Sequence, residues 1–251
     1  MKKWLNKLVN NKTFIQIFIV TALLFFLIPA SIIGIQQILR RIIRFFIIEM
    51  IYYMCYTMIR LIYNVKIVGL NNIPSGPAVL ICNHVSFIDF LILGTLFTNR
   101  KVRFVMDYNI YKTNKFVTWM CDTYHSIPIA TWRQNAQVKE QAFCTINRYL
   151  NEGHLVLLFP EGEVTYTGDM VEFKGGLDRI QIENKAPIVP IGLKGLVGGF
   201  FSRVGGSFNL KKVYKELRRE IKIIISPPIK AEQKKPEEFK QLIQELIDRK
   251  D

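Results

Sequence analysis

From residue 61 onward the chain alternates short runs of β-branched, apolar residues with longer and more polar stretches, and this alternation restricts its fold more than any other feature. Two of the polar stretches, 136–150 and the one after Pro236, place apolar residues at helical spacing. Alternating strands and helices build an α/β fold, in which helices cover a sheet. We therefore predict about seven strands, at 65–69, 78–82, 102–106, 126–130, 155–159, 187–193 and 221–226.

The region before residue 61 is strongly apolar. Residues 13–39 are 27 residues without a charge, and as a helix they would measure about 40 Å against a hydrocarbon core of roughly 30 Å. Pro29 and Gly34 interrupt this stretch, and positive residues flank both ends, so a spanning helix, a hairpin and an interfacial helix all stay open. A second stretch, 45–58, contains Glu49 and three tyrosines, which is typical of an interfacial helix. We predict membrane-binding helices over 1–60 and an α/β domain over 61–251.

Lysine and arginine outnumber the acidic residues by 34 to 20, which gives a formal charge of +14. The first 88 residues hold nine of these cations and a single acidic residue, Glu49. Cations beside apolar segments are attracted to anionic lipids by about 1 kcal/mol each, whereas nucleic-acid binders place them on a polar face. Membrane lipids are therefore the expected partner, and no nucleic acid is expected.

The four cysteines, Cys55, Cys82, Cys121 and Cys144, show neither a CxxC pair nor the spacing of a zinc site. We expect reduced thiols that pack as small apolar groups, and we expect no metal. Reduced cysteines fit a reducing cytoplasm.

The sharpest motif follows the predicted strand 78–82, where Asn83 and His84 precede Asp89. An ideal helix places side chains five residues apart about 140° from each other, so His84 and Asp89 meet only if His84 lies in the turn and Asp89 enters the next helix. The end of a strand is also where an α/β sheet exposes its working groups. His84 can then act as a general base while Asp89 orients its ring. A helix cap or a surface ion pair is the structural alternative.

A second motif, Phe159-Pro160-Glu161-Gly162, ends a predicted buried strand and presents a carboxylate on a turn. Lys174 follows, directly before a pair of glycines and a predicted helix. Glycines at a helix N-terminus leave backbone N–H groups available for a phosphate, with Lys174 as the counter-charge. An ordinary turn and helix entry would give the same pattern.

Together the motifs resemble those of the glycerolipid acyltransferases related to 1-acylglycerol-3-phosphate acyltransferase. Asn83-His84 with Asp89 is similar to their NHx4D motif, residues 159–162 to their FPEG motif, and residues 189–191 to a strand that they share. The resemblance covers roughly residues 60–230 and implies a glycerol-3-phosphate acyltransferase-like fold, with a mixed sheet behind membrane-binding helices. It also implies acyl transfer from acyl-CoA or acyl carrier protein to the free hydroxyl of a lysophospholipid, most often 1-acyl-sn-glycerol 3-phosphate, which gives phosphatidic acid.

The same resemblance implies roles for individual residues. His84 takes the hydroxyl proton and Asp89 orients His84, so these two are expected to be catalytic. Asn83, Glu161 and Gly162 are expected to bind the acceptor or to shape its site. Because the hydroxyl attacks the thioester directly, the resemblance implies no serine or cysteine nucleophile, no metal and no cofactor.

Two departures from the family pattern leave the acceptor's head group open. Members that act on lysophosphatidic acid usually continue the FPEG motif with an arginine, whereas this chain continues with Glu163. Their intermediate motif closes on Asp-Arg, whereas here Arg133 comes late and the aspartate is absent. We expect Arg133 and Lys174 to reach the acceptor phosphate. Glu163 and the segments 195–196 and 200–203 are more similar to acyltransferase domains fused to acyl carrier protein synthetases, which implies reacylation of lysophosphatidylethanolamine as the alternative.

Two further functions stay open. A thioesterase or lipid hydrolase would use Cys82 or a water molecule with His84. A non-catalytic, membrane-anchored scaffold would keep the His–Asp pair as a structural contact. The leading expectation is a lysophospholipid O-acyltransferase on the cytoplasmic face of the cell membrane. A secretory signal peptide over 1–30 is less favoured, since the apolar stretch is longer than a typical signal core and the acyl donors would be missing outside.

Overall fold

The computed structural model describes residues 33–97, 102–204, 216–231 and 234–249, together with Gln16. Residues 13–32 of the first apolar stretch lie outside the described residues, apart from Gln16, and so does nearly all of the alternative signal peptide. The chain divides into two compact units, residues 1–55 and residues 56–251. Helix α3 (Ile33–Ile62) runs through their boundary and contains the second apolar stretch, 45–58. No helix in the described part of the chain is both long and apolar enough to cross a membrane.

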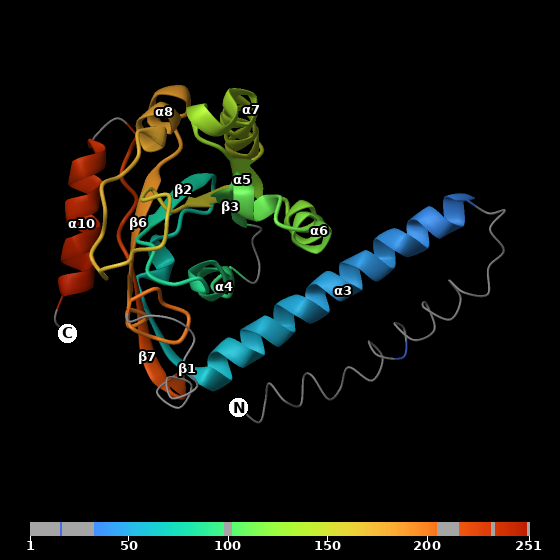
Figure 1. Cartoon of the computed structure of the whole chain (residues 1–251), viewed down its shortest axis with the longest axis horizontal. Coiled ribbons are helices and arrows are strands. Elements are labelled where there is room, and N and C mark those ends of the chain that lie inside the picture. Colours follow the sequence, from blue (N-terminus) through green and yellow to red (C-terminus); the bar gives the residue numbers. More distant parts are fainter. Residues whose placement is uncertain (1–15, 17–32, 98–101, 205–215, 232–233, 250–251) are drawn as a thin grey trace. The chain divides into compact units, whose positions relative to one another are not determined.

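Within the described residues, seven strands form one mixed sheet in the order β1-β7-β6-β2-β5-β3-β4 (Figure 1). β7 is antiparallel to β6 and parallel to β1, whereas β6, β2, β5, β3 and β4 share one direction. The α/β fold with a mixed sheet is therefore confirmed, and each predicted strand ends within two residues of its expected bounds. The strands are β1 (Tyr63–Val68), β2 (Ala78–Cys82), β3 (Val102–Asp107), β4 (Ile127–Ile129), β5 (Leu155–Leu158), β6 (Ile188–Lys194) and β7 (Arg219–Ile225).

Both predicted helices are present, and the first of them begins earlier than expected. Helix α7 starts with a capped turn at Thr131 and is interrupted at Asn135, whose φ of −165° is not helical. The Asn135 side chain then accepts a hydrogen bond from the N–H of Val138, so it caps the regular part that the periodicity predicted. The helices after α3 are α4 (Asp89–Gly94), α5 (Tyr108–Tyr111), α6 (Lys115–Thr123), α7 (Trp132–Asn151), α8 (Gly176–Glu183) and α10 (Pro236–Asp248), with a short 3-10 helix η1 (Leu70–Asn72).

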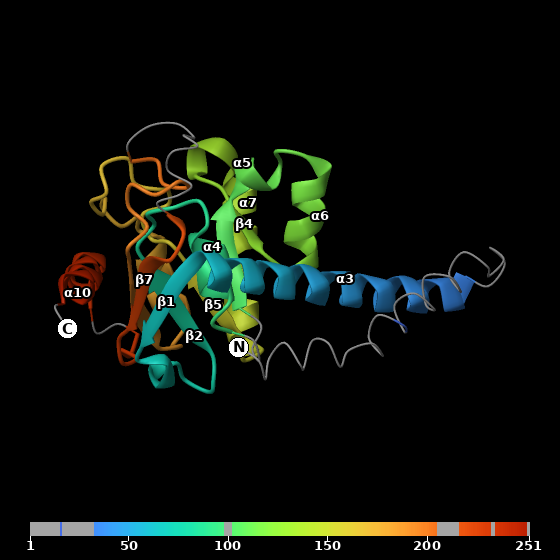
Figure 2. The same ribbon diagram turned by 90° about the horizontal axis from the view of Figure 1, so that it is seen from below.

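The core has two layers because side chains alternate across each strand. On β2, Leu80 and Cys82 pack on the side of α4 and of the last turns of α3. Val79 and Ile81 pack on the other side, against α7, α8 and α10. Figures 1 and 2 show these helices covering the two faces of the sheet. A strand that is buried on both faces reads as a continuous apolar run, which is why β2 and β5 were recognisable from sequence.

The strand directions decide where the motifs meet. β2 lies beside β5 and runs parallel to it, so their carboxyl ends lie at the same edge of the sheet. The loop after β2 holds His84, and the loop after β5 holds Glu161. The carboxyl edge of parallel strands is where α/β proteins place their ligands. The topology therefore brings together two motifs that are more than seventy residues apart.

Candidate active site

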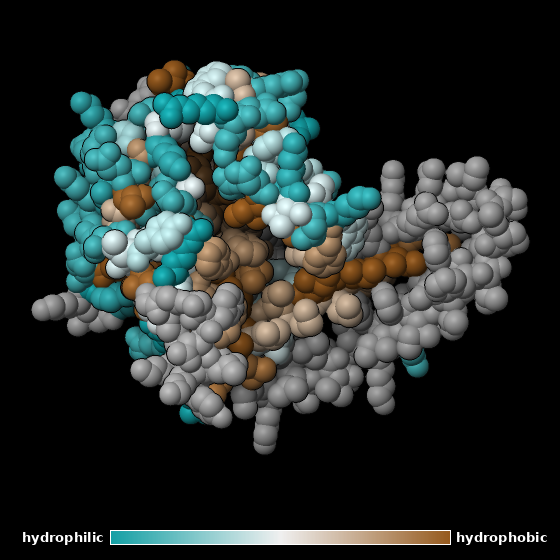
Figure 3. Space-filling view, in the orientation of Figure 1, coloured by the Kyte–Doolittle hydropathy of each residue, from teal (hydrophilic) through white to brown (hydrophobic). Residues whose placement is uncertain are grey.

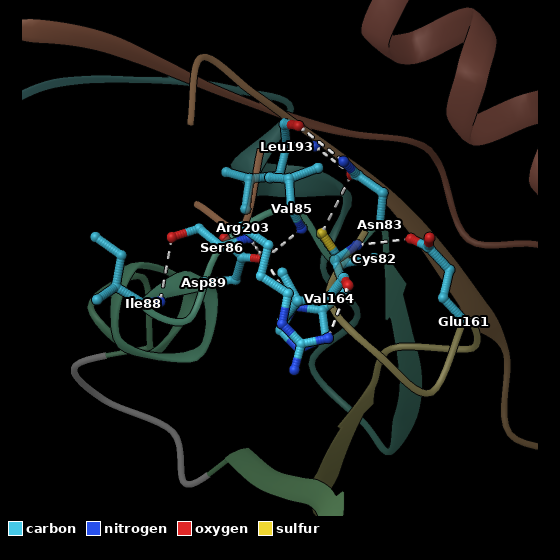
Figure 4. Close-up of polar contacts among 11 residues, drawn as sticks. Cys82, Asn83, Val85, Ser86, Ile88, Asp89, Glu161, Val164, Leu193 and Arg203 are labelled. Carbon is cyan, nitrogen blue, oxygen red and sulfur yellow. Dashed lines mark hydrogen bonds and ion pairs between the residues drawn. The ribbon is translucent and has the colours of Figure 1, made fainter. Parts of the chain in front are cut away.

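Asp89 is the first residue of α4, and it turns back onto the loop that follows β2. Its Oδ2 atom lies 2.8 Å from Nδ1 of His84. The same oxygen accepts hydrogen bonds from the backbone N–H groups of Val85, at 2.7 Å, and Ser86, at 2.9 Å. Figure 4 shows Asp89 held beside these two residues. His84 in the turn and Asp89 at the helix start thus form the contact that their spacing required.

The His84 ring is fixed in one orientation. Nδ1 faces the Asp89 carboxylate and so carries the ring proton, which leaves Nε2 as the basic atom. Nε2 makes no hydrogen bond with any described residue. The ring also stacks on Phe159, with 4.1 Å between the ring centroids. The His84 side chain is 18% exposed, whereas that of Asp89 is completely buried, so only the imidazole is open to a reactant.

The electrostatics around Asp89 suit a partner for an imidazolium ion. Burial raises the pKa of Asp89, while the hydrogen bonds from His84, Ser86 and Val85 act in the opposite direction. Its Oδ1 atom is buried and has no hydrogen-bond partner among the described residues. A buried, incompletely bonded carboxylate gains most when a positive charge forms beside it. His84 and Asp89 therefore have the chemistry of a general base and the group that orients it.

Glu161 holds the two loops together. Its Oε1 accepts a hydrogen bond of 2.7 Å from the backbone N–H of His84, and its Oε2 accepts one of 3.0 Å from Val171. In return, the His84 carbonyl accepts a hydrogen bond from the N–H of Thr165. Glu161 is buried, and this burial raises its pKa. The Glu161 carboxylate thus fixes the backbone of His84, while its expected role in shaping the acceptor site stays a prediction.

Asn83 is placed differently from the expected substrate contact. Its amide donates to the carbonyl of Leu193 at 2.9 Å and accepts from the N–H of Leu193 at 2.7 Å. The side chain is buried and joins the end of β2 to β6. Both of its polar groups are occupied, so this geometry favours a positioning role over contact with an acceptor.

Gly162 and Lys174 lie together at the turn after β5. Gly162 has a φ of +71°, and a Cβ atom there would lie 2.5 Å from Nζ of Lys174. The backbone N–H of Lys174 also donates to the carbonyl of Pro160. The left-handed backbone favours glycine at 162, whereas the flexible Lys174 side chain above it could shift to admit a Cβ atom. Helix α8 begins two residues later, at Gly176.

Arg133 is not part of this group of residues. It is exposed on the first turn of α7, just after β4. In the sheet order, β5 and β3 lie between β4 and β2, and neighbouring strands are about 4.8 Å apart. Arg133 thus shares the edge of the sheet with His84, but it contacts neither His84 nor Glu161.

Two residues near His84 had no assigned role in the sequence analysis. Phe159 supplies the ring on which His84 stacks, and its signal is its place at the end of the buried run before Pro160. Arg203 lies over Phe87 and Tyr166, one from each of the two loops. It follows a different strand, so no local pattern links it to the motifs.

Apolar side chains are exposed beside the loop that carries His84. Phe87 and Phe90, before and within α4, are 44% and 43% exposed. Figure 3 shows hydrophobic residues gathered over α4, next to more hydrophilic surfaces. Exposed aromatic residues next to a reactive group suit a substrate with an apolar chain.

The chain is similar in sequence to several curated enzymes. It is 30% identical over 135 residues to the chloroplastic 1-acyl-sn-glycerol-3-phosphate acyltransferase LPAT1 of Arabidopsis thaliana, covering 53% of this chain and 36% of that enzyme. It is 27% identical over 173 residues to a probable 1-acyl-sn-glycerol-3-phosphate acyltransferase of Mycoplasma genitalium, covering 66% and 62%. The match to the plant enzyme thus spans little more than a third of its length.

A solved structure shares the fold. The 1-acyl-sn-glycerophosphate acyltransferase PlsC from Thermotoga maritima superposes with a TM-score of 0.56 at 18% identity, covering 92% of this chain and 85% of that one. In addition, the model of the family described as Acyltransferase matches residues 64–194, just over half of the chain, and this range contains both motifs. The chain therefore belongs to the acyltransferase family.

Proposed function

We propose that this protein transfers an acyl group from acyl-CoA or acyl carrier protein to the free hydroxyl of 1-acyl-sn-glycerol 3-phosphate, forming phosphatidic acid. The observation that carries the proposal is the His84 ring, whose Nδ1 is bound to Asp89 while Nε2 stays available. The family match and the names of the relatives support this acceptor.

The reaction needs one general base and forms no covalent acyl-enzyme intermediate. Nε2 of His84 takes the proton of the acceptor hydroxyl as its oxygen bonds to the thioester carbonyl carbon. The carbonyl electron pair moves to the carbonyl oxygen and returns as the carbon–sulfur bond breaks. The departing thiolate takes the proton back from His84, and Asp89 stabilises the imidazolium between these two steps.

The other residues act by position or by charge. Glu161 holds the backbone N–H of His84, and Asn83, the preceding residue, anchors the chain to β6. Lys174, above Gly162, is assigned to the negative charge of the acceptor. Contact between Arg133 and the acceptor phosphate stays a prediction.

The region before residue 61 is assigned to membrane binding, on the cytoplasmic face, where acyl donors are made. Its composition is apolar and basic, and α3 exposes Met50, Tyr53 and Met54. Acceptor and product both reside in the bilayer, so a lipid-bound front end would keep the catalytic domain at its substrate.

The surroundings of Cys82 weaken the form of the hydrolase alternative in which this thiol is the nucleophile, but not the form that uses a water molecule with His84. This thiol is completely buried, and burial raises its pKa well above the ordinary value. A thiol that stays protonated and inaccessible is a poor nucleophile.

The proposal is tested with purified protein and with acyl-CoA or acyl-loaded carrier protein as the donor. The acceptor is lysophosphatidic acid, lysophosphatidylethanolamine or none, and mass spectrometry identifies the products. We expect phosphatidic acid as the main product. If only lysophosphatidylethanolamine is acylated, it is the acceptor in place of lysophosphatidic acid. Fatty acid released equally fast with and without acceptor would favour a hydrolase. A folded protein that forms no product with either donor would favour the scaffold.

A further inference from the structure

A third loop reaches the site from β6, the strand that neighbours β2. The backbone N–H of Phe87, in the turn between His84 and Asp89, donates a hydrogen bond of 3.1 Å to the carbonyl of Phe201. Arg203 lies two residues further on. The loop after β6 is thus tied to the loop that carries the base.

The guanidinium group of Arg203 lies over two aromatic rings. Its Cζ is 5.1 Å from the centroid of Phe87 and 4.5 Å from that of Tyr166. Figure 4 shows the side chain extending to the carbonyl of Val164, which accepts a long hydrogen bond of 3.4 Å from Nη1. Val164 precedes Thr165, whose N–H bonds to the His84 carbonyl. Arg203 is therefore held between the two loops that fix the base.

Most hydrogen-bond donors of Arg203 are not used. Stacking on aromatic faces orients a guanidinium group without occupying its N–H groups. The one hydrogen bond, to Val164, is long, and no described carboxylate forms an ion pair with Arg203. The carboxylates near the base, Asp89 and Glu161, are buried and bonded to His84 and to backbone N–H groups. By contrast, Arg179 is paired with two glutamates.

We propose that Arg203 binds the phosphate monoester of the acceptor, an inference that rests on the proposed function. A planar fork of N–H donors matches the oxygens of a phosphate. In 1-acyl-sn-glycerol 3-phosphate only a few bonds separate the reacting hydroxyl from the phosphorus atom, so the phosphate must lie close to the ring that takes the proton. In acyl-CoA the long pantetheine arm separates the phosphates from the thioester, which makes the donor the less suitable occupant.

This assignment also accounts for the sequence after Gly162. The chain has Glu163 there, and Glu163 is exposed. Arg203 comes from another loop and supplies a cation that residues 163–165 do not. The specificity for a phosphate would thus depend on the loop after β6 and not on the FPEG turn alone.

The test compares two acceptors in the presence of one acyl donor. Lysophosphatidic acid carries the phosphate monoester, and the matching monoacylglycerol lacks it. For Arg203→Gln we expect the KM for lysophosphatidic acid to rise at least about tenfold, with little change for monoacylglycerol or for the donor. Arg203→Lys keeps the charge but loses the fork of N–H donors, so its KM for lysophosphatidic acid should lie between the values of wild type and Arg203→Gln. Arg148→Gln is the matched control, because Arg148 is also stacked on a ring, that of Tyr149, and lies at the far end of α7.

The possible outcomes separate the inference from the proposed function. An Arg203→Gln variant with unchanged kinetics, with equal losses on both acceptors, or with a raised KM for the donor alone would overturn the inference while leaving acyl transfer intact. Absence of transfer by the wild-type protein would instead contradict the proposed function.

Binding gives a second readout that does not depend on turnover. Lysophosphatidic acid below its micelle concentration should raise the Tm of the wild-type protein and of Arg148→Gln, and should raise that of Arg203→Gln much less. Monoacylglycerol should shift the Tm of the wild-type protein and of both variants by the same amount. An equal Tm shift in all three proteins with lysophosphatidic acid, or no shift in any, would contradict phosphate binding by Arg203.

Discussion

Among the described residues, Glu216 and Asp89 are each the centre of a buried cluster, and the two clusters differ in whether polar atoms remain without a partner. Around Glu216, the carboxylate accepts hydrogen bonds from the Tyr63 hydroxyl at 2.7 Å, the Phe200 N–H at 2.9 Å and the Arg219 guanidinium at 3.0 Å. Both of its oxygens are bonded. Around Asp89, one oxygen takes every hydrogen bond, Oδ1 has no partner among the described residues, and the imidazole keeps Nε2 available.

We propose that this difference separates a structural cluster, around Glu216, from a reactive one, around Asp89. Saturated hydrogen bonding stabilises one conformation, and the charge of Glu216 is balanced by Arg219. A reactive cluster must instead keep a basic atom accessible to the substrate and a carboxylate that can stabilise the positive charge formed during the reaction. Mutations in the Asp89 cluster should therefore reduce turnover, and mutations in the Glu216 cluster should reduce stability.

The largest effect is expected for His84→Ala. Removing the base should lower kcat at least about a hundredfold, with little change in Tm. His154→Ala is a matched control, because His154 also lies beside a carboxylate, that of Glu152, and lies outside both motifs. Steady-state kinetics with lysophosphatidic acid would measure both variants. A His84→Ala protein that turns over nearly as fast as wild type would remove the distinction between the two clusters.

Asp89→Asn should have the next largest effect. An amide can hold the ring in the wrong tautomer and cannot stabilise an imidazolium, so kcat should fall at least about tenfold. Asp178→Asn, in the first turn of α8, is an exposed control. The same kinetic assay measures both variants, and equal kcat values would mean that Asp89 only holds the loop after β2 in place.

Glu216→Gln should show the opposite behaviour. Replacing a charged acceptor by an amide in a buried network should reduce the free energy of unfolding by about 1–3 kcal/mol. The kcat of the folded variant should stay close to that of the wild type. Denaturant unfolding and kinetics on the same preparation would check both. A stable variant with low kcat would contradict the structural role.

A smaller effect is expected on the pH dependence of stability, because Glu161 is a buried carboxyl group. Burial raises the pKa of Glu161 above its ordinary value of 4.5, so the folded protein keeps this proton at pH values where the unfolded chain has lost it. Its contribution to stability is full below the unfolded-state pKa and is lost as pH rises through the folded-state value. The stability advantage of wild type over Glu161→Gln should therefore be largest at and below about pH 4.5 and should shrink toward neutrality. An advantage that grows with pH would show that the two N–H bonds lower this pKa instead.

The strands and the His84–Asp89 contact could be predicted from the sequence because both depend on residues that are close together in the chain. The strands read as β-branched runs, and the His84–Asp89 contact spans five residues within one turn. The partners of Asn83 and Glu161 could not be predicted, since they are backbone groups supplied by other strands and loops, such as Leu193 and Val171. For the same reason no role could be assigned to Arg203 from the sequence: the position of an arginine relative to a distant motif depends on the sheet order, which one sequence does not reveal.

The central claim is that Asp89 acts through His84, and a double-mutant comparison tests it most directly. Residues that act as a unit give strongly non-additive effects. With kcat measured for His84→Ala, Asp89→Asn and the double variant, the account predicts that the double variant is no slower than His84→Ala alone. A double variant slowed by the product of the two single losses would show that the two residues act independently.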